Sequence, residues 1–290
     1  MTRQSQSPEL QGWALILGAS SGFGGAASLA LAKAGMHIFG VHLDRKATMP
    51  NVERIITEIK QAGREAVFFN VNASDQEKRR EVLEQMEKTL ADRGETSSVK
   101  IMLHSLAFGS LKPFLAPSPR DTITQAQMDM TLDVMAHSLI YWVQELVTRK
   151  LMVCGGRVYA MTSSGGTRVW AGYGAVSAAK AALESHIRQL AMELAPLGIT
   201  ANAIRAGVTD TPALRKIPGN QEIVQTALAM NPSGRLTTPE DIASALVVLS
   251  RPETYWITGN VLGVDGGEDV VGFSTSSPFK AGGAERPTPA

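Results

Sequence analysis

Short apolar runs alternate with longer segments of helical spacing along this chain of 290 residues. Apolar runs that end in turn residues predict strands. Seven such runs occur, at residues 13–17, 36–43, 66–71, 99–103, 157–161, 199–204 and 260–264. Between them, small or apolar residues at helical spacing predict helices at 26–34, 52–62, 81–90, 128–151, 176–194 and 239–249.

This alternation predicts a mostly parallel sheet covered on both faces, because parallel strands need crossover connections. No linker rich in Pro and Gly interrupts residues 12–272, so we predict one α/β domain with a doubly wound sheet of about seven strands. Residues 1–11 and 273–290 are predicted to be flexible ends. Ligands of such sheets bind at the carboxyl ends of the strands, where the strand order reverses.

Composition narrows the possible partners. A hydrophobic content of 44% suffices for a buried core, and a net charge of +1 indicates neither a nucleic-acid surface nor attraction to anionic membranes. No apolar run is long enough to span a bilayer and no signal peptide is recognisable, so we expect a cytoplasmic protein. The five histidines lack metal-ligand spacing, which predicts no metal site. The single cysteine, Cys154, is predicted to be a small buried hydrophobe.

A glycine-rich turn joins the first predicted strand to the following helix. Glycine allows the backbone to approach a pyrophosphate closely, and the helix N-terminus offers unpaired N–H groups to that anion. The turn therefore predicts a dinucleotide site. Its predicted contacts are Gly18, Ser20, Ser21, Gly22, Phe23 and Gly24.

The residues at the end of the second predicted strand indicate whether the cofactor is NAD or NADP. A carboxylate there binds the ribose 2′-hydroxyl of NAD, whereas a cation favours the 2′-phosphate of NADP. The sequence offers Asp44 followed by Arg45 and Lys46. The two cations favour NADP(H), with Arg45 as the predicted contact, and Asp44 keeps NAD(H) open.

Tyr173 and Lys180 are the strongest catalytic candidates. Their separation of seven residues is close to two helical turns, so both side chains can share one helix face. A neighbouring ammonium is expected to lower the pKa of the phenol, which favours proton donation or stabilisation of an oxyanion. The pair follows a predicted strand that ends in Thr162, Ser163 and Ser164.

Residues 12–272 resemble the short-chain dehydrogenase/reductase superfamily, which has a Rossmann-like fold. The resemblance rests on the spacing of the glycine turn and on two closing segments, Ile257-Thr258-Gly259 and Val264-Asp265-Gly266-Gly267. It aligns the usual acidic position of the second strand with His42. It implies further cofactor contacts from Asn72, Ala73, Ser105, Lys180, Gly207, Val208, Thr209 and Thr211.

The catalytic spacing resembles one branch of that superfamily. Six residues separate Tyr173 from Lys180, where most members have three, and this gap is similar to that of enoyl-acyl-carrier-protein reductases. The pair His104-Ser105 and the segment 203–211 resemble the same branch. The resemblance implies reduction of the 2,3 double bond of an enoyl thioester in fatty acid synthesis, with Tyr173 stabilising the enolate. The implied substrate contacts are Ala107, Phe108, Trp170 and Tyr173.

Two positions depart from that branch. Ser163 lies ten residues before Tyr173, where enoyl reductases often carry an aromatic residue, and it has the spacing to Lys180 of the catalytic serine of carbonyl reductases. Asp133 stands where carbonyl reductases hold a network Asn. Ser163 is therefore a third catalytic candidate. A carbonyl reductase of 3-oxoacyl thioesters or other ketones is the alternative, and a non-catalytic NADP-binding redox sensor is the minor one.

The resemblance also implies a homotetramer and an acyl thioester substrate, carried by coenzyme A or by acyl carrier protein. Residues 212–235 are predicted to form a lid over the acyl chain. Adjacent residues of a strand point to opposite faces, so His104 and Ser105 are not expected to act as a base and nucleophile.

Overall fold

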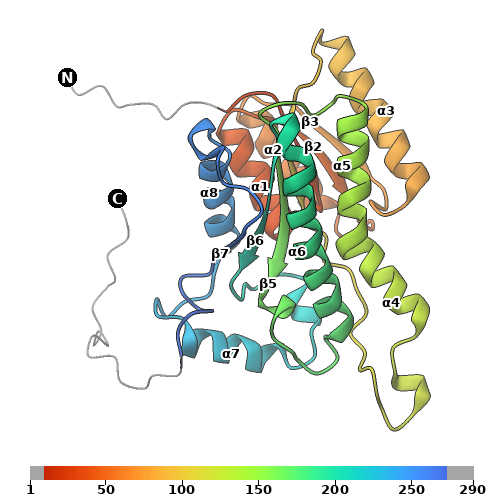
Figure 1. The fold of residues 1–290 in the computed structure, drawn as a ribbon, viewed down its shortest axis with the longest axis vertical. Helices are drawn as coiled ribbons and strands as arrows, with labels where there is room; N and C mark the ends of the chain where they lie inside the picture. Colours follow the sequence, from red (N-terminus) through yellow and green to blue (C-terminus); the bar gives the residue numbers. More distant parts are fainter. Residues whose placement is uncertain (1–9, 273–290) are drawn as a thin grey trace, which may run out of the picture.

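Seven parallel strands form one sheet in the computed structural model, which describes residues 10–272 (Figure 1). The strand order is β3-β2-β1-β4-β5-β6-β7. The strands are β1 (Trp13–Leu17), β2 (His37–His42), β3 (Ala66–Asn70), β4 (Val99–His104), β5 (Arg157–Ser163), β6 (Thr200–Ala206) and β7 (Val261–Val264). The predicted Rossmann-like α/β sheet is confirmed, whereas the predictions for residues 1–9 and 273–290 lie outside the described residues.

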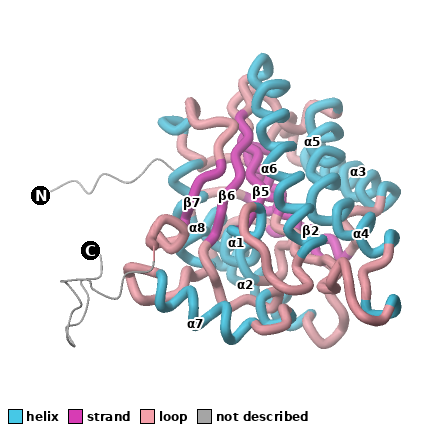
Figure 2. Tube along the Cα trace, turned by 60° about the horizontal axis from the view of Figure 1, so that its bottom comes forward, coloured by secondary structure: helices cyan, strands magenta, loops and turns pink. Residues whose placement is uncertain are grey.

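Helices cover both faces of the sheet. The side chains of α1 (Gly22–Lys33), α2 (Met49–Gln61) and α8 (Pro239–Leu249) share one hydrophobic core with the strands. The other core contains side chains from α3 (Gln76–Asp92), α5 (Ser138–Thr148) and α6 (Gly174–Leu194), with α4 (Gln125–Leu132) continuing toward α5. The helix α7 (Asn220–Met230) lies beyond the arrowheads of β5 and β6, at the end that Figure 2 turns toward the viewer.

The central strand β1 explains why its sequence is a continuous apolar run. All five of its residues are buried. Trp13 and Leu15 belong to one core and Ala14 and Ile16 to the other, because successive side chains of a strand point to opposite faces. A strand covered on both faces cannot show the polar alternation of a half-exposed one.

The strand order reverses at β1, which lies between β2 and β4. The loops that leave β1 and β4 approach each other there very closely. A Cβ on Gly18 would lie only 2.4 Å from the carbonyl oxygen of Ser105, and Gly18 has a φ of +89°. Glycine is therefore required at the first position of the turn for both space and backbone conformation.

The predicted helix at 128–151 differs from the observed one. The chain is helical from Gln125 to Thr148, but residues Asp133–His137 form a π-helical turn between α4 and α5. Because apolar residues continue through the turn, periodicity alone did not reveal it. Within 212–235, the structure forms the short helix Leu214–Lys216 and then α7.

Cys154 is exposed, so the prediction of a small buried hydrophobe is wrong. It lies in a turn before β5 begins at Arg157, outside the strand that would have buried it. Among the described residues, no helix is both long and apolar enough to cross a membrane.

Candidate active site at the carboxyl ends of the strands

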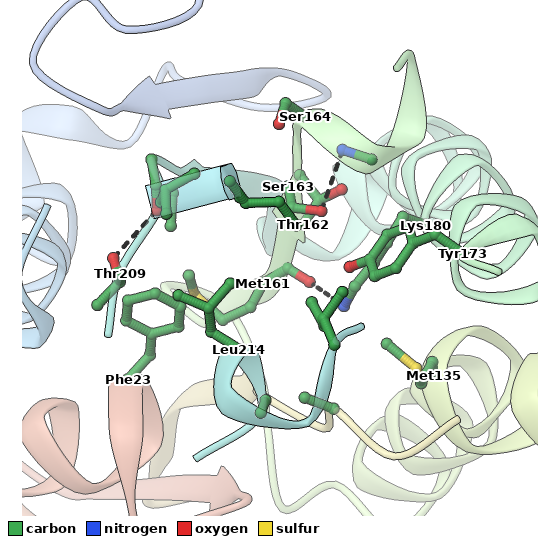
Figure 3. A pocket seen from close by; sticks show the side chains of 18 of the residues that line it. Phe23, Met135, Met161, Thr162, Ser163, Ser164, Tyr173, Lys180, Thr209 and Leu214 are labelled. Atoms are coloured by element: carbon green, nitrogen blue, oxygen red, sulfur yellow. Dashed lines mark hydrogen bonds between the residues drawn. The ribbon is translucent and has the colours of Figure 1, made fainter. Parts of the chain in front are cut away.

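A pocket of about 890 Å³, open mouth included, lies at the carboxyl ends of β4, β5 and β6 (Figure 3). The pocket contains Tyr173 and Lys180 at one end and mostly apolar side chains elsewhere. Its lining residues are Phe23, Ser105, Leu106, Ala107, Met135, Met161, Thr162, Ser163, Ser164, Gly165, Trp170, Tyr173, Lys180, Ala206, Gly207, Val208, Thr209, Ala213, Leu214, Ile217 and Ile223.

Tyr173 immediately precedes α6, and Ser163 is the last residue of β5. Burial raises the pKa of Tyr173, and a hydrogen bond with the Ser163 side chain opposes that effect without cancelling it. The expected lowering of this pKa by Lys180 is therefore wrong, because loss of hydration dominates in the pocket. The Trp170 ring packs edge-on against Tyr173, with ring centroids 5.6 Å apart.

Lys180 lies in the second turn of α6 and is buried, with 5% of its surface exposed. Its Nζ donates a hydrogen bond to the carbonyl oxygen of Met161 at 2.7 Å. Burial lowers the pKa of Lys180 to about 8, while the nearby charge of Glu184 acts in the opposite direction. The ammonium group is thus close to its titration point near neutral pH.

The glycine turn fits the pyrophosphate of a dinucleotide. A Cβ on Gly24 would lie 2.1 Å from the carbonyl oxygen of Gly18, so the turn could not close around a larger residue. Ser21 is the N-cap residue of α1, but its side chain makes no capping hydrogen bond. The first N–H groups of α1 therefore lack a side-chain cap and are suited to an anionic ligand.

Several predicted cofactor residues lie around the same pocket. Ser105, Gly207, Val208 and Thr209 line it. The Thr211 side chain lies beside Gly22, where an added Cβ would be 3.7 Å from its methyl group. These positions bring the segment after β6 to the start of α1.

The remaining predicted cofactor residues lie farther along the sheet edge. The Asn72 Oδ1 accepts hydrogen bonds from the backbone and hydroxyl of Ser74, and the Ala73 carbonyl oxygen accepts one from Trp142 Nε1 at 2.8 Å. Arg45 is exposed in the loop after β2. The cofactor contacts of these three residues stay predictions.

Of the predicted substrate residues, Ala107, Trp170 and Tyr173 line the pocket. Phe108 does not, and 63% of its surface is exposed. Leu214, Ile217 and Ile223 of the 212–235 segment line the pocket, so the segment predicted to cover the acyl chain contributes to its apolar wall. Met135 completes that wall, and sequence reasoning did not predict it as a site residue.

A pair of carboxylates behind the pocket was also missed. Glu268 is buried, accepts a hydrogen bond from the Val208 N–H at 3.2 Å, and has a pKa raised by burial. The neighbouring Asp269 forms ion pairs with Arg168 at 3.1 Å and with Arg205 at 3.0 Å. Through these contacts, the loop after β7 holds two segments of the pocket in place, those that follow β5 and β6.

His104 and Ser105 point to opposite sides of the strand end, as expected. Ser105 lines the pocket, whereas His104 is fully buried and its Nε2 lies 2.8 Å from the Ser138 hydroxyl. Burial lowers the pKa of His104 to about 3, with Lys180 adding to the effect. His104 is therefore neutral near pH 7 and belongs to the packing beneath the site.

The fold and this site define an oxidoreductase of the short-chain dehydrogenase/reductase superfamily, whose members bind nicotinamide cofactors. Within it, the chain belongs to the enoyl-reductase-like branch: the family model described as Enoyl-(Acyl carrier protein) reductase matches residues 18–268.

Individual relatives are distant. The chain is 28% identical over 284 residues to 1-cyclohexenylcarbonyl-CoA reductase of Streptomyces collinus, covering 97% of this chain and 94% of that protein. It is 25% identical to a 3-oxoacyl-[acyl-carrier-protein] reductase of Thermotoga maritima, over 87% of this chain and 96% of that one. Enoyl-[acyl-carrier-protein] reductase (NADH) of Aquifex aeolicus superposes with a TM-score of 0.76 at 25% identity, over 92% and 99% of the two chains.

Proposed function

We propose that this protein reduces the 2,3 double bond of an enoyl thioester with a nicotinamide cofactor. The observation that carries the proposal is the placement of Tyr173 and Lys180 at one end of a pocket whose other walls are largely apolar (Figure 3). The polar end suits the thioester carbonyl. The apolar walls, which include Met135, Leu214 and Ile217, suit an acyl chain.

The residues of the site divide the chemistry between them. When bound, a nicotinamide would supply the hydride for the β-carbon, and a proton added at the α-carbon of the resulting enolate would complete the reduction. Tyr173 remains protonated, because burial raises its pKa, and it donates a hydrogen bond to the thioester oxygen as negative charge develops there. Lys180 holds the nicotinamide ribose and contributes a positive charge that favours the enolate. Water is excluded by the apolar side chains of the 212–235 segment.

Ser163 favours a second candidate function. Its side chain lies close enough to Tyr173 to oppose the rise in the pKa of that phenol, so the two hydroxyl groups can polarise one carbonyl oxygen. This arrangement would support reduction of a 3-oxoacyl thioester or another ketone. A non-catalytic NADP-binding sensor would instead bind cofactor tightly and turn over neither substrate.

The test compares oxidation of NADH and NADPH by the purified protein with crotonyl-coenzyme A and with acetoacetyl-coenzyme A. We expect the wild type to turn over the enoyl substrate alone. Tyr173→Phe should lower that turnover at least about 100-fold. Ser163→Ala is the matched comparison, and it should retain most enoyl reduction. Turnover of the ketone alone, abolished by Ser163→Ala, would overturn the proposal in favour of a carbonyl reductase.

We also propose a substrate carrier, a cellular location and an oligomeric state. The substrate is an acyl thioester carried by coenzyme A or by acyl carrier protein, the protein works in the cytoplasm, and it assembles as a homotetramer. These statements rest on the family resemblance. Light scattering of the purified full chain measures the assembly, and rates with crotonyl groups on each carrier separate the two carriers.

A further inference from the structure

Four consecutive residues after β6 form one wall of the pocket. Residues 206–209 all line it, and Thr209 lies on the opposite side of the pocket from Tyr173 (Figure 3). Thr211, two residues further on, lies beside Gly22 at the start of α1. The wall therefore runs between the glycine turn and the catalytic end of the pocket. A dinucleotide whose pyrophosphate binds at that turn would place its nicotinamide in front of this wall.

The backbone of the wall is held by contacts from behind. The Val208 carbonyl oxygen accepts a hydrogen bond from the Thr237 N–H at 3.2 Å. The Gly207 N–H donates to the Val264 carbonyl oxygen at 3.4 Å. The Val208 N–H donates to both carboxylate oxygens of Glu268, each at 3.2 Å. A Cβ on Gly207 would lie only 3.0 Å from Oε2 of Glu268, so this carboxylate packs directly against the wall.

Glu268 brings a negative charge to the wall without a basic partner. It is 4% exposed. Among the described residues no basic side chain forms an ion pair with it, and Arg168 pairs with Asp269 instead. Burial raises the pKa of Glu268, and the Val208 N–H opposes that rise. The charges of Asp265 and Asp269 raise the pKa further.

The charge of Glu268 is not needed to hold the wall. A neutral side-chain oxygen would also accept a hydrogen bond from the Val208 N–H, and it would avoid the free energy needed to bury a carboxylate without a counter-ion. The charge therefore calls for a second role. It is placed to attract a positive charge that lies in the pocket, on the other side of the Val208 peptide.

The nicotinamide ring changes its charge in the reaction. The reduced ring is neutral. When a hydride leaves its C4 with the bonding electron pair and adds to the substrate, the ring becomes a cation. A nearby carboxylate attracts the cationic ring and has little effect on the neutral one. Burial strengthens this attraction, because buried charges are screened less than charges in water.

We propose that Glu268 raises the affinity of the pocket for the oxidised, cationic nicotinamide relative to the reduced one, and so favours departure of the hydride. The inference rests on the nicotinamide site of the proposed function. Glu268 lies behind Val208 and is not a lining residue of the pocket, so it is a positioning residue and not a catalytic one. Its charge acts equally on NAD(H) and NADP(H), because the two cofactors carry the same ring.

The test measures cofactor binding and not turnover. Isothermal titration calorimetry gives the dissociation constants of NADH, NAD⁺, NADPH and NADP⁺ for the purified full-length protein at one pH, about 7.5. Glu268→Gln keeps an acceptor for the Val208 N–H and removes the charge. It should weaken binding of the oxidised form about tenfold and change binding of the reduced form less than about twofold.

Two further variants separate charge from structure. Glu253→Gln makes the same chemical change at an exposed residue of the short helix Pro252–Thr254, and it should leave every dissociation constant unchanged. Glu268→Ala removes the acceptor as well as the charge, and it should weaken binding of both forms, the oxidised one more. A purely structural role would weaken both forms in proportion, so the ratio of their constants is the diagnostic quantity. Thermal melting verifies that each variant is folded.

The outcomes distinguish the two proposals. An unchanged ratio in Glu268→Gln, or a ratio shifted toward the oxidised form, would overturn the role of Glu268 while leaving the proposed reaction intact. The expected shift in the ratio without turnover of either thioester would support Glu268 and overturn the proposed reaction. Failure of all four nucleotides to bind would overturn both.

Discussion

At the scale of single residues, Lys180 shows how burial and charge set the chemistry of the site. Its ammonium group is enclosed between α6 and the end of β5, where burial favours the neutral form. Glu184 lies one turn further along α6 and favours the charged form. The carboxylate is held in place by a hydrogen bond from the Thr162 hydroxyl at 2.7 Å. Glu184 therefore partly offsets the effect of burial and favours the protonated form of the lysine.

This balance predicts the alkaline limit of activity. Because Lys180 acts in its protonated form and has a pKa of about 8, kcat/KM should fall as the pH rises through about 8. Glu184→Gln removes the opposing charge, lowers the Lys180 pKa further and moves the fall to lower pH. Glu193→Gln, on the exposed part of the same helix, should leave the profile unchanged. An unmoved profile in Glu184→Gln would show that the charge has no role.

Gly165 controls the position of Tyr173. A Cβ at residue 165 would lie 2.6 Å from Cε1 of Tyr173 and 3.1 Å from the Ser163 hydroxyl oxygen. We expect Gly165→Ala to displace the phenol ring and lower kcat about tenfold or more, since small displacements of catalytic groups are costly. Gly272→Ala, where a Cβ meets nothing within 4 Å, is the control for steady-state assays. Unchanged kcat in Gly165→Ala would contradict this geometry.

At the scale of elements, the π-helical turn at Asp133–His137 joins the pocket to the sheet. It carries Met135 into the pocket lining, and it leaves the Val134 carbonyl oxygen to accept from the Ser138 hydroxyl at 2.9 Å. Because that hydroxyl donates to Val134, it must accept from His104 Nε2–H on β4. The buried Ser138 side chain thus links the π-helical turn to the end of β4.

Ser138→Ala should therefore destabilise the protein by about 1–3 kcal/mol, because the buried His104 N–H loses its acceptor. Ser28→Ala is the matched control. Ser28 is also buried in a helix and bonds to the carbonyl oxygen four residues earlier, at 2.8 Å. A side-chain bond of that kind alone adds little stability. Urea unfolding of both variants measures the difference, and equal losses would count against the His104–Ser138 contact.

At the scale of the whole molecule, the buried neutral His104 links global stability to pH. The unfolded chain binds a proton at this residue below about pH 6.5, whereas the folded protein does so only near pH 3. Stability is therefore complete above pH 6.5 and is lost as the pH falls below it, by about 2 kcal/mol at pH 5 from this residue alone. The difference between the unfolding free energies at pH 7 and pH 5 should be smaller in His104→Gln than in the wild type, and smaller by that amount. An equal pH dependence in both proteins would refute the burial of a neutral imidazole.

The strands and most helices follow from local pattern because burial on both faces requires continuous apolar runs. The predicted 13–17 run coincides with β1, and the predicted 239–249 segment coincides with α8, whose Thr238 forms a capping box with Asp241. The hydrophobic pattern does not predict the conformation where contacts with residues distant in the chain determine it. The π-helical turn is followed by Ser138, which contacts a strand residue more than thirty positions away. The exposure of Cys154 depends on where β5 begins.

The sequence by itself determined the alternating α/β architecture, the glycine turn, and the choice of Tyr173, Lys180 and Ser163 as chemical groups. These features depend on residue type and on the spacing of residues that are near one another in the sequence. Both act through local backbone conformation and hydrophobic burial. Only the tertiary structure decided the protonation state of the site and the walls of the pocket. Burial raises the pKa of Tyr173 against the expectation from a neighbouring charge, and distant loops bring Glu268 behind Val208. Solvation and packing depend on residues far apart in the chain, so no local pattern encodes them.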